Sequence, residues 1–387
     1  MATKKPALGR GLSSLLGGGS KSLAAATETE LAVIRHRAKE RRMTPATWAM
    51  ALVRRHIGIA APVDRDTGAD RTILVKPICS RLRFIDRDHL FLGRTDGVVM
   101  IAEESTSFPG VTKPVHEGGL GFGFKWNMGW MNDSLRYLAL EPIYRQYHHH
   151  EMTFAMVYQY SENFVLPISH DEVVHGKGSM INKIPQDSWR QFATLRAFYS
   201  FMWGFPGKQL LFMGCEFGQR TEFNEATSLE WWVSDLWGHH GLQRLIKDLN
   251  ELYTASPALW KLDSDPAGFR WINADDASGN TFSWVRSDGE GEHVAVIVNF
   301  SSEPWANYKI GLPAAGVWKE VLNSDAGSYD GSDSFGNLGQ VEAHEESFNG
   351  YEAAATVVEA IQPDFAGDLP RFARETILWG RKSGTML

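Results

Sequence analysis

Short runs of consecutive apolar residues punctuate the middle of the 387-residue chain, and polar residues follow each run at once. The runs at 97–102, 164–168 and 208–214 have the length and continuous apolar character of strands buried on both faces, as in parallel sheets. Apolar residues recur at steps of three and four over 186–204 and again over 241–255. Strands that alternate with helices in this way predict right-handed βαβ units and an α/β fold.

The hydrophobic pattern changes at about residue 268. Apolar and polar residues then alternate with period two over 281–285 and 293–298, and turns rich in Asp, Gly and Ser separate these segments. This alternation predicts an antiparallel all-β domain over 268–362. The tail, 363–387, shows no clear pattern and stays unassigned.

The first sixty residues differ from the rest of the chain in charge. They hold 11 Lys and Arg against three acids, whereas the whole chain has a net charge of −7. Residues 1–27 are rich in Gly, Ser and Ala, which predicts a disordered basic tail. Residues 28–60 show the spacing of two short helices, and 61–96 is interpreted as a linker and an unassigned segment.

Composition excludes several classes of protein. The two cysteines, Cys79 and Cys215, are too few for a disulfide framework, and without a Cys-x-x-Cys pair they offer no zinc site. No apolar run reaches the ~18 residues that a membrane-spanning helix needs. The N-terminus also lacks the apolar core of a signal peptide. We therefore expect a cytoplasmic protein with no membrane partner and no metal.

Carboxylates stand directly after two of the predicted strands. Glu103 and Glu104 follow the first, and Asp171 and Glu172 follow the second, beside His170. In α/β barrels catalytic groups come from the carboxyl ends of strands, and paired carboxylates there suit glycoside chemistry. The alternative is structural, because a single acid after a strand often caps a helix or forms a loop ion pair.

Tryptophans are a second candidate feature. Trp126 and Trp130 lie in a glycine-containing stretch, where indole rings can stack on the faces of sugars. The alternative is that these rings belong to the hydrophobic core, as most tryptophans do. The sequence leaves both interpretations open.

Several long motifs lie between about residues 97 and 350: the segments 99–106, 118–122, 125–131, 144–149, 166–177 and 205–208. Together they closely resemble the bacterial 1,4-α-glucan (glycogen) branching enzymes of the α-amylase superfamily. The resemblance implies a partial (β/α)8 barrel, strands five to eight, over 97–267, followed by an all-β sandwich over 268–362. It also implies glycogen biosynthesis by retaining glycosyl transfer, in which an α-1,4-glucan segment moves to a 6-hydroxyl.

The resemblance also implies roles for individual residues. Glu103 would be the general acid/base, Asp171 the transition-state stabiliser, and His170 a ligand of a substrate hydroxyl, with no metal or organic cofactor. The family's nucleophile lies in a Gly-x-Arg-x-Asp-Ala motif that this sequence lacks. Asp86 is the nearest candidate, but it follows Arg83 one residue too late and lies too close to Glu103 for a strand and crossover helix between them. We therefore expect a truncated or fused form that lacks the nucleophile and is inactive alone.

The N-terminal region resembles a different family. Residues 4–17 are similar to the N-terminal peptide of plasmid and chromosome partitioning proteins, which engages a partner ATPase. The basic charge of residues 1–60 also suits DNA. The alternative function is thus a non-catalytic adaptor that binds DNA or a partition ATPase and carries a glucan-binding body. A solvated basic tail is the third interpretation.

Overall fold

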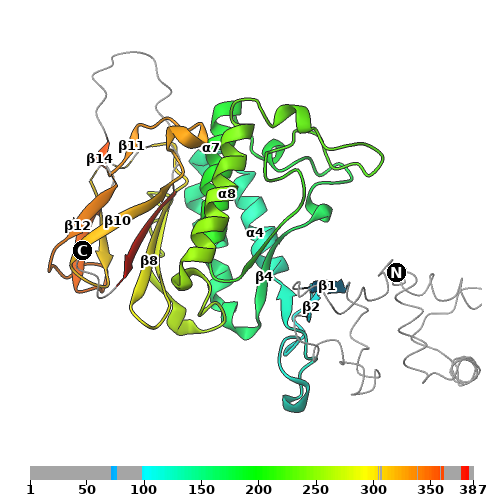
Figure 1. Cartoon of the computed structure of the whole chain (residues 1–387), viewed down its shortest axis with the longest axis horizontal. Helices are drawn as coiled ribbons and strands as arrows, with labels where there is room; N and C mark the ends of the chain where they lie inside the picture. The colour runs from blue at the N-terminus through cyan, green and yellow to red at the C-terminus, as the bar shows by residue number, and fades with distance from the viewer. Residues whose placement is uncertain are drawn as a thin grey trace, which may run out of the picture. The chain divides into compact units, whose positions relative to one another are not determined.

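The computed structural model describes residues 71–75, 98–303, 305, 307–337, 339–357, 359–360 and 376–382 (Figure 1). The chain divides into two units, residues 1–124 and 125–387. The predicted basic tail, the predicted helix pair over 28–60 and Asp86 lie outside the described residues. No helix in the described ranges is both long and apolar enough to cross a membrane.

The first unit contains a pair of parallel strands. β1 (Arg71–Val75) runs beside β2 (Val98–Ala102), in a register that places Arg71 opposite Val98. The strand expected at 97–102 is thereby confirmed. β1 was not expected, since it falls in the 61–96 stretch that was interpreted as a linker and an unassigned segment.

The second unit begins with three further parallel strands and their helices. β4 (Phe164–Ile168) pairs with β3 (Phe124–Trp126) on one side and with β5 (Lys208–Leu211) on the other, and every residue of β4 is buried. The helices are α4 (Met128–Leu138), α5 (Pro142–Arg145), α6 (His149–Thr153), α7 (Ser188–Gly204) and α8 (His239–Ala255). The expected strands at 164–168 and 208–214 and both expected long helices are therefore present.

The all-β C-terminal domain is confirmed. Its larger sheet has the order β12-β10-β15-β8-β7-β6, and its neighbouring strands are antiparallel; a smaller sheet pairs β9 with β13, and β11 pairs with β14. The strands are β6 (Phe269–Asn273), β7 (Thr281–Ser287), β8 (Glu292–Asn299), β9 (Tyr308–Leu312), β10 (Gly316–Asn323), β11 (Phe335–Gly336), β12 (Gln340–Ala343), β13 (Ala353–Val357), β14 (Glu359–Ala360) and β15 (Thr376–Lys382). β15 lies in the tail that the sequence left unassigned, and it completes the sheet between β8 and β10.

The side chains of β8 pack alternately into two different hydrophobic cores. Val294, Val296 and Val298 pack in the cluster that also contains residues of α7, whereas Ala295 and Ile297 pack against the smaller sheet. Successive side chains of a strand point to opposite faces, so a strand covered on both faces buries both sets. Figure 1 shows α7 beside the sheet that contains β8. The α/β part of the second unit and the all-β domain therefore share one hydrophobic core.

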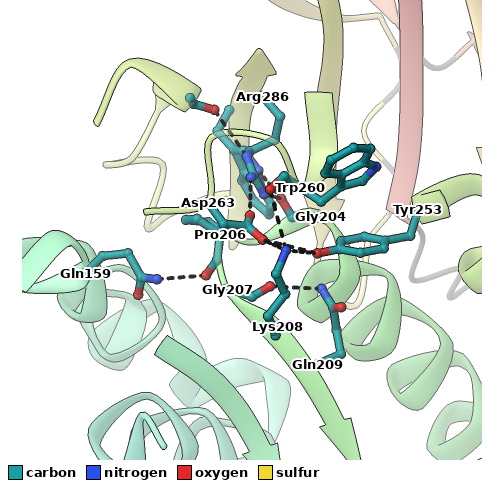
Figure 2. Close-up of polar contacts among 12 residues, drawn as sticks. Gln159, Gly204, Pro206, Gly207, Lys208, Gln209, Tyr253, Trp260, Asp263 and Arg286 are labelled. Carbon is teal, nitrogen blue, oxygen red and sulfur yellow. Dashed lines mark hydrogen bonds and ion pairs between the residues drawn. The ribbon is translucent and has the colours of Figure 1, made fainter. Parts of the chain in front are cut away.

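A buried ionic junction reinforces this contact (Figure 2). The Asp263 carboxylate accepts hydrogen bonds from Arg286 Nη2 at 2.6 Å, Lys208 Nζ at 2.6 Å and the Tyr253 hydroxyl at 3.1 Å. Arg286, on β7, is fully buried and also donates to the carbonyl of Gly204 at 3.1 Å. Lys208 is the first residue of β5, so the family-like segment 205–208 contributes to this junction at the amino end of the strand.

Candidate functional site

The turn that follows β4 carries the candidate acidic residues. β4 ends at Ile168, and Ser169 caps a short 3-10 helix, His170–Glu172. The Glu172 carboxylate accepts hydrogen bonds from Ser169 N at 2.6 Å and from the Ser169 hydroxyl at 2.7 Å, and it is 5% exposed. The Ser169 hydroxyl in turn accepts a hydrogen bond from Asp171 N at 3.3 Å, which completes a capping box and fixes the entry into the turn. Glu172 is therefore a structural residue that holds its neighbours in place.

Asp171 and His170 are presented to solvent by this turn. Their side chains are 43% and 39% exposed, and His170 Nε2 lies 3.0 Å from Asp171 Oδ1. The His170 ring also lies 6.0 Å from the ring of Phe212, which follows β5. A carboxylate and an imidazole beside an aromatic ring can together bind hydroxyl groups and stabilise positive charge.

A loop that follows β5 forms hydrogen bonds with the segment after Asp171. Glu222 accepts hydrogen bonds from Gly178 N at 2.5 Å and Gly176 N at 3.0 Å, and both glycines have positive φ. These two backbone donors hold the pKa of the Glu222 carboxyl below its ordinary value. Phe223 N also donates to the carbonyl of Val173 at 2.9 Å. Glu222 could not be identified from the sequence, because its partners lie more than forty residues away and no local motif marks it.

Glu103 follows β2 in the first unit, whereas Asp171 and His170 lie in the second. Glu103 is half-buried, and the neighbouring Glu104 carboxylate accepts a hydrogen bond from Thr106 N at 2.9 Å. Within the second unit, the structure brings His170 and Asp171 into contact.

The two candidate tryptophans are both buried. Trp130 is 1% exposed, belongs to the main hydrophobic core and stacks on Phe198, with ring centroids 5.9 Å apart. Trp126 is 4% exposed. Burial of this degree favours the packing interpretation for Trp130. Several other indole rings do reach solvent, among them those of Trp231, Trp232 and Trp237, which are 53%, 70% and 48% exposed.

Within the described residues, no group of three or more His, Cys, Asp or Glu side chains is placed to hold a metal ion. Cys215 is buried, and burial raises the pKa of its thiol well above the ordinary value. A thiol in this state is a poor nucleophile. In the turn after β4, the polar groups that face solvent are the carboxylate of Asp171 and the imidazole of His170.

Known proteins resemble this chain over about two thirds of its length. Residues 271–360 match the family model described as alpha amylase, C-terminal all-beta domain. Over 262 residues, or 68% of this chain, the sequence is 69% identical to the 1,4-alpha-glucan branching enzyme GlgB of Cutibacterium acnes, of which the match covers 40%. The resemblance to bacterial 1,4-α-glucan branching enzymes is confirmed. The branching enzymes of Leifsonia xyli and Frankia casuarinae are 54% and 57% identical over similar lengths, with 36% and 33% of their own chains covered.

The chain thus spans between one third and two fifths of the length of the branching enzymes that it matches. Among solved structures, an alpha-amylase from H. orenii shares 17% identity over 74% of this chain and 54% of its own, with a TM-score of 0.43. At that distance the likeness carries no information about the site. The comparisons give no support to DNA or a partition ATPase as a partner of residues 1–60.

Proposed function

We propose that this chain carries part of a catalytic unit that branches α-1,4-glucan by retaining glycosyl transfer. The observation that carries the proposal is the 69% identity to a branching enzyme over a stretch of 262 residues. The turn at the end of β4 adds support, because it presents Asp171 and His170 to solvent while Glu172 is buried. In this proposal β2 to β5 correspond to strands five to eight of a (β/α)8 barrel.

Each candidate residue has a defined chemical task in this proposal. Glu103 protonates the oxygen of the α-1,4 bond as it breaks, and later accepts the proton of the attacking 6-hydroxyl. Asp171 stabilises the positive charge that develops at the sugar ring, and His170 donates a hydrogen bond to a ring hydroxyl. A retaining transfer also needs a carboxylate that holds the glucosyl group between these steps. That nucleophile comes from outside the matched residues, since the match lacks its motif.

A chimera tests these roles directly. The matched 262 residues of this chain replace their counterpart in the Cutibacterium acnes enzyme, and branching of amylose is followed by the fall in iodine colour. We expect the chimera to branch, and Glu103→Gln and Asp171→Asn each to lower the rate about a thousandfold. Glu290→Gln is the matched control, because that carboxylate forms a surface ion pair with Lys261 and is 74% exposed. Full activity in the Asp171→Asn chimera would refute the assignment.

A further inference from the structure

The segment between α4 and β4 is buried on one face and apolar on the other. α5, α6 and the 3-10 turns around them carry the chain through 142–161. One face of this segment is buried in the second unit, through Pro142, Arg145, His149, Met152 and Ala155. These positions recur at helical steps of three and four, as expected for the core-facing side of a surface helix.

The opposite face is apolar and lies in solvent. It consists of Ile143, Tyr144, Tyr147, Phe154 and Val157, which are 68%, 56%, 70%, 52% and 78% exposed. We call these five residues the 143–157 stripe. Positions 143, 147, 154 and 157 are spaced as neighbours on one side of a helix. A helical segment that is buried on one side and exposes a row of large apolar side chains on the other is typical of an element covered on both sides.

A second observation concerns the edge of the parallel sheet. Among the described residues β5 pairs with β4 alone, and all four of its residues are only half-buried. Met213, just beyond β5, is 53% exposed. Parallel sheets are normally covered on both faces, and an open edge strand offers unpaired backbone groups to another chain. The second unit therefore has two surfaces that further polypeptide would cover.

The branching enzymes indicate which polypeptide covers these surfaces. The match leaves 60% of the Cutibacterium acnes enzyme without a counterpart, since it covers 40% of that protein. We propose that the 143–157 stripe is a docking surface for that remaining polypeptide, present in the relatives within the same chain. The inference rests on the proposed function for the identity of the partner. The stripe has an apolar centre bordered by the exposed polar residues Glu141 and His150, which is the anatomy of a protein–protein interface.

Hydroxyl-radical footprinting tests the proposal on two intact proteins. Side chains of the 143–157 stripe are oxidised in this chain, and the aligned segment is followed in the full-length Cutibacterium acnes enzyme. We expect oxidation of that segment to be about tenfold slower in the enzyme, because close-packed interfaces exclude solvent. Val317, which lies on β10 and is 49% exposed, is the matched control and should react at similar rates in both proteins. Equal oxidation of the stripe in the two proteins would overturn the inference.

Co-expression provides the second measurement. This chain is produced together with the unmatched part of the Cutibacterium acnes enzyme, and their complex is measured by sedimentation without glucan. Tyr147→Glu and Val157→Glu should weaken the complex at least about tenfold, while Val317→Glu leaves it unchanged. The inference would be overturned if both stripe variants still formed the complex. It would also be overturned if this chain formed a homodimer instead of the complex and Tyr147→Glu dissociated that homodimer. A stripe-dependent complex that fails to branch amylose would count against the proposed function and leave the docking surface intact.

Discussion

Two adjacent carboxylates after β4 have opposite environments. Asp171 is 43% exposed, whereas Glu172 is buried and accepts two short hydrogen bonds from Ser169. Their sequence positions alone suggested one acidic cluster. The Ser-x-x-Glu spacing of the capping box was the signal that could have separated them.

This difference predicts opposite effects on stability. Glu172→Ala should lower the free energy of unfolding by about 1–3 kcal/mol, because it leaves buried donors of Ser169 without their acceptor. Asp171→Asn should change it by less than about 0.5 kcal/mol, as exposed substitutions usually do. Urea unfolding followed by circular dichroism measures both. Equal losses in the two variants would contradict the assigned roles.

His149 makes stability depend on pH. It is 5% exposed, stacks on Phe282 with ring centroids 4.0 Å apart, and its Nε2 lies 2.9 Å from the carbonyl of Ala274. Burial lowers the pKa of this imidazole, although the carbonyl contact and the nearby Asp276 and Asp275 act in the opposite direction. The folded protein therefore favours the neutral ring.

The sign of the effect follows from linkage. Because the folded-state pKa of His149 lies below the unfolded value of about 6.5, the unfolded chain binds the proton first as the pH falls. Stability from this group is complete well above that unfolded pKa, and falls below it by at most about 1.4 kcal/mol per pH unit. His149→Gln retains a donor for Ala274 and should flatten the dependence of unfolding free energy on pH below about 6.5. An unchanged slope in this variant would contradict the prediction.

At the scale of elements, the buried junction of Figure 2 links β5, α8 and β7 through Asp263. Asp263→Ala leaves the fully buried Arg286 without its carboxylate, and breaking such a pair commonly costs about 3–5 kcal/mol. Glu290→Gln, which breaks the surface pair with Lys261, should cost less than about 1 kcal/mol. Chemical denaturation of both variants measures the contrast. Similar midpoints would show that the junction adds nothing to stability.

The elements that the sequence predicted are those whose pattern is local. The apolar run of β4 and the helical spacing of α7 are visible in the residues themselves. β15 could not be predicted, because its place is decided by pairing with β8 and β10, which lie far away in the sequence. The ionic junction around Asp263 escaped notice for the same reason. Local pattern specifies an element, whereas tertiary contacts decide which buried charges meet.

At the scale of the whole molecule, the α/β part and the all-β domain are not independent modules. Trp284 of β7 packs in the same core as Phe201 of α7, with ring centroids 5.2 Å apart, and its indole N–H donates to the carbonyl of Gly204. The sequence placed a domain boundary near residue 268, where the pattern changes from helical to alternating. A change of pattern marks a change of secondary structure, but it says nothing about whether the two sides share a core.

We expect the 387-residue chain by itself to show no measurable branching of amylose. Retaining transfer needs a nucleophile that stores the glucosyl group, and the sequence lacks the Gly-x-Arg-x-Asp-Ala motif that supplies it in the family. Glu103 can exchange protons and Asp171 can stabilise charge, yet neither replaces that covalent step. Because the members of a catalytic set act as a unit, loss of one commonly costs several powers of ten.

The measurement is the fall in iodine colour of amylose, beside the full-length Cutibacterium acnes enzyme at equal concentration. Asp86 decides the interpretation of a positive result, because it is the nearest candidate for the missing carboxylate. A rate within about tenfold of the control enzyme, abolished by Asp86→Asn, would refute the prediction and make Asp86 the nucleophile. A rate that survives Asp86→Asn but is lost in Asp171→Asn would place the nucleophile elsewhere in the chain. With neither result, the measurement agrees with the proposal that Glu103 and Asp171 act as acid/base and stabilising carboxylate while the nucleophile belongs to the rest of the enzyme.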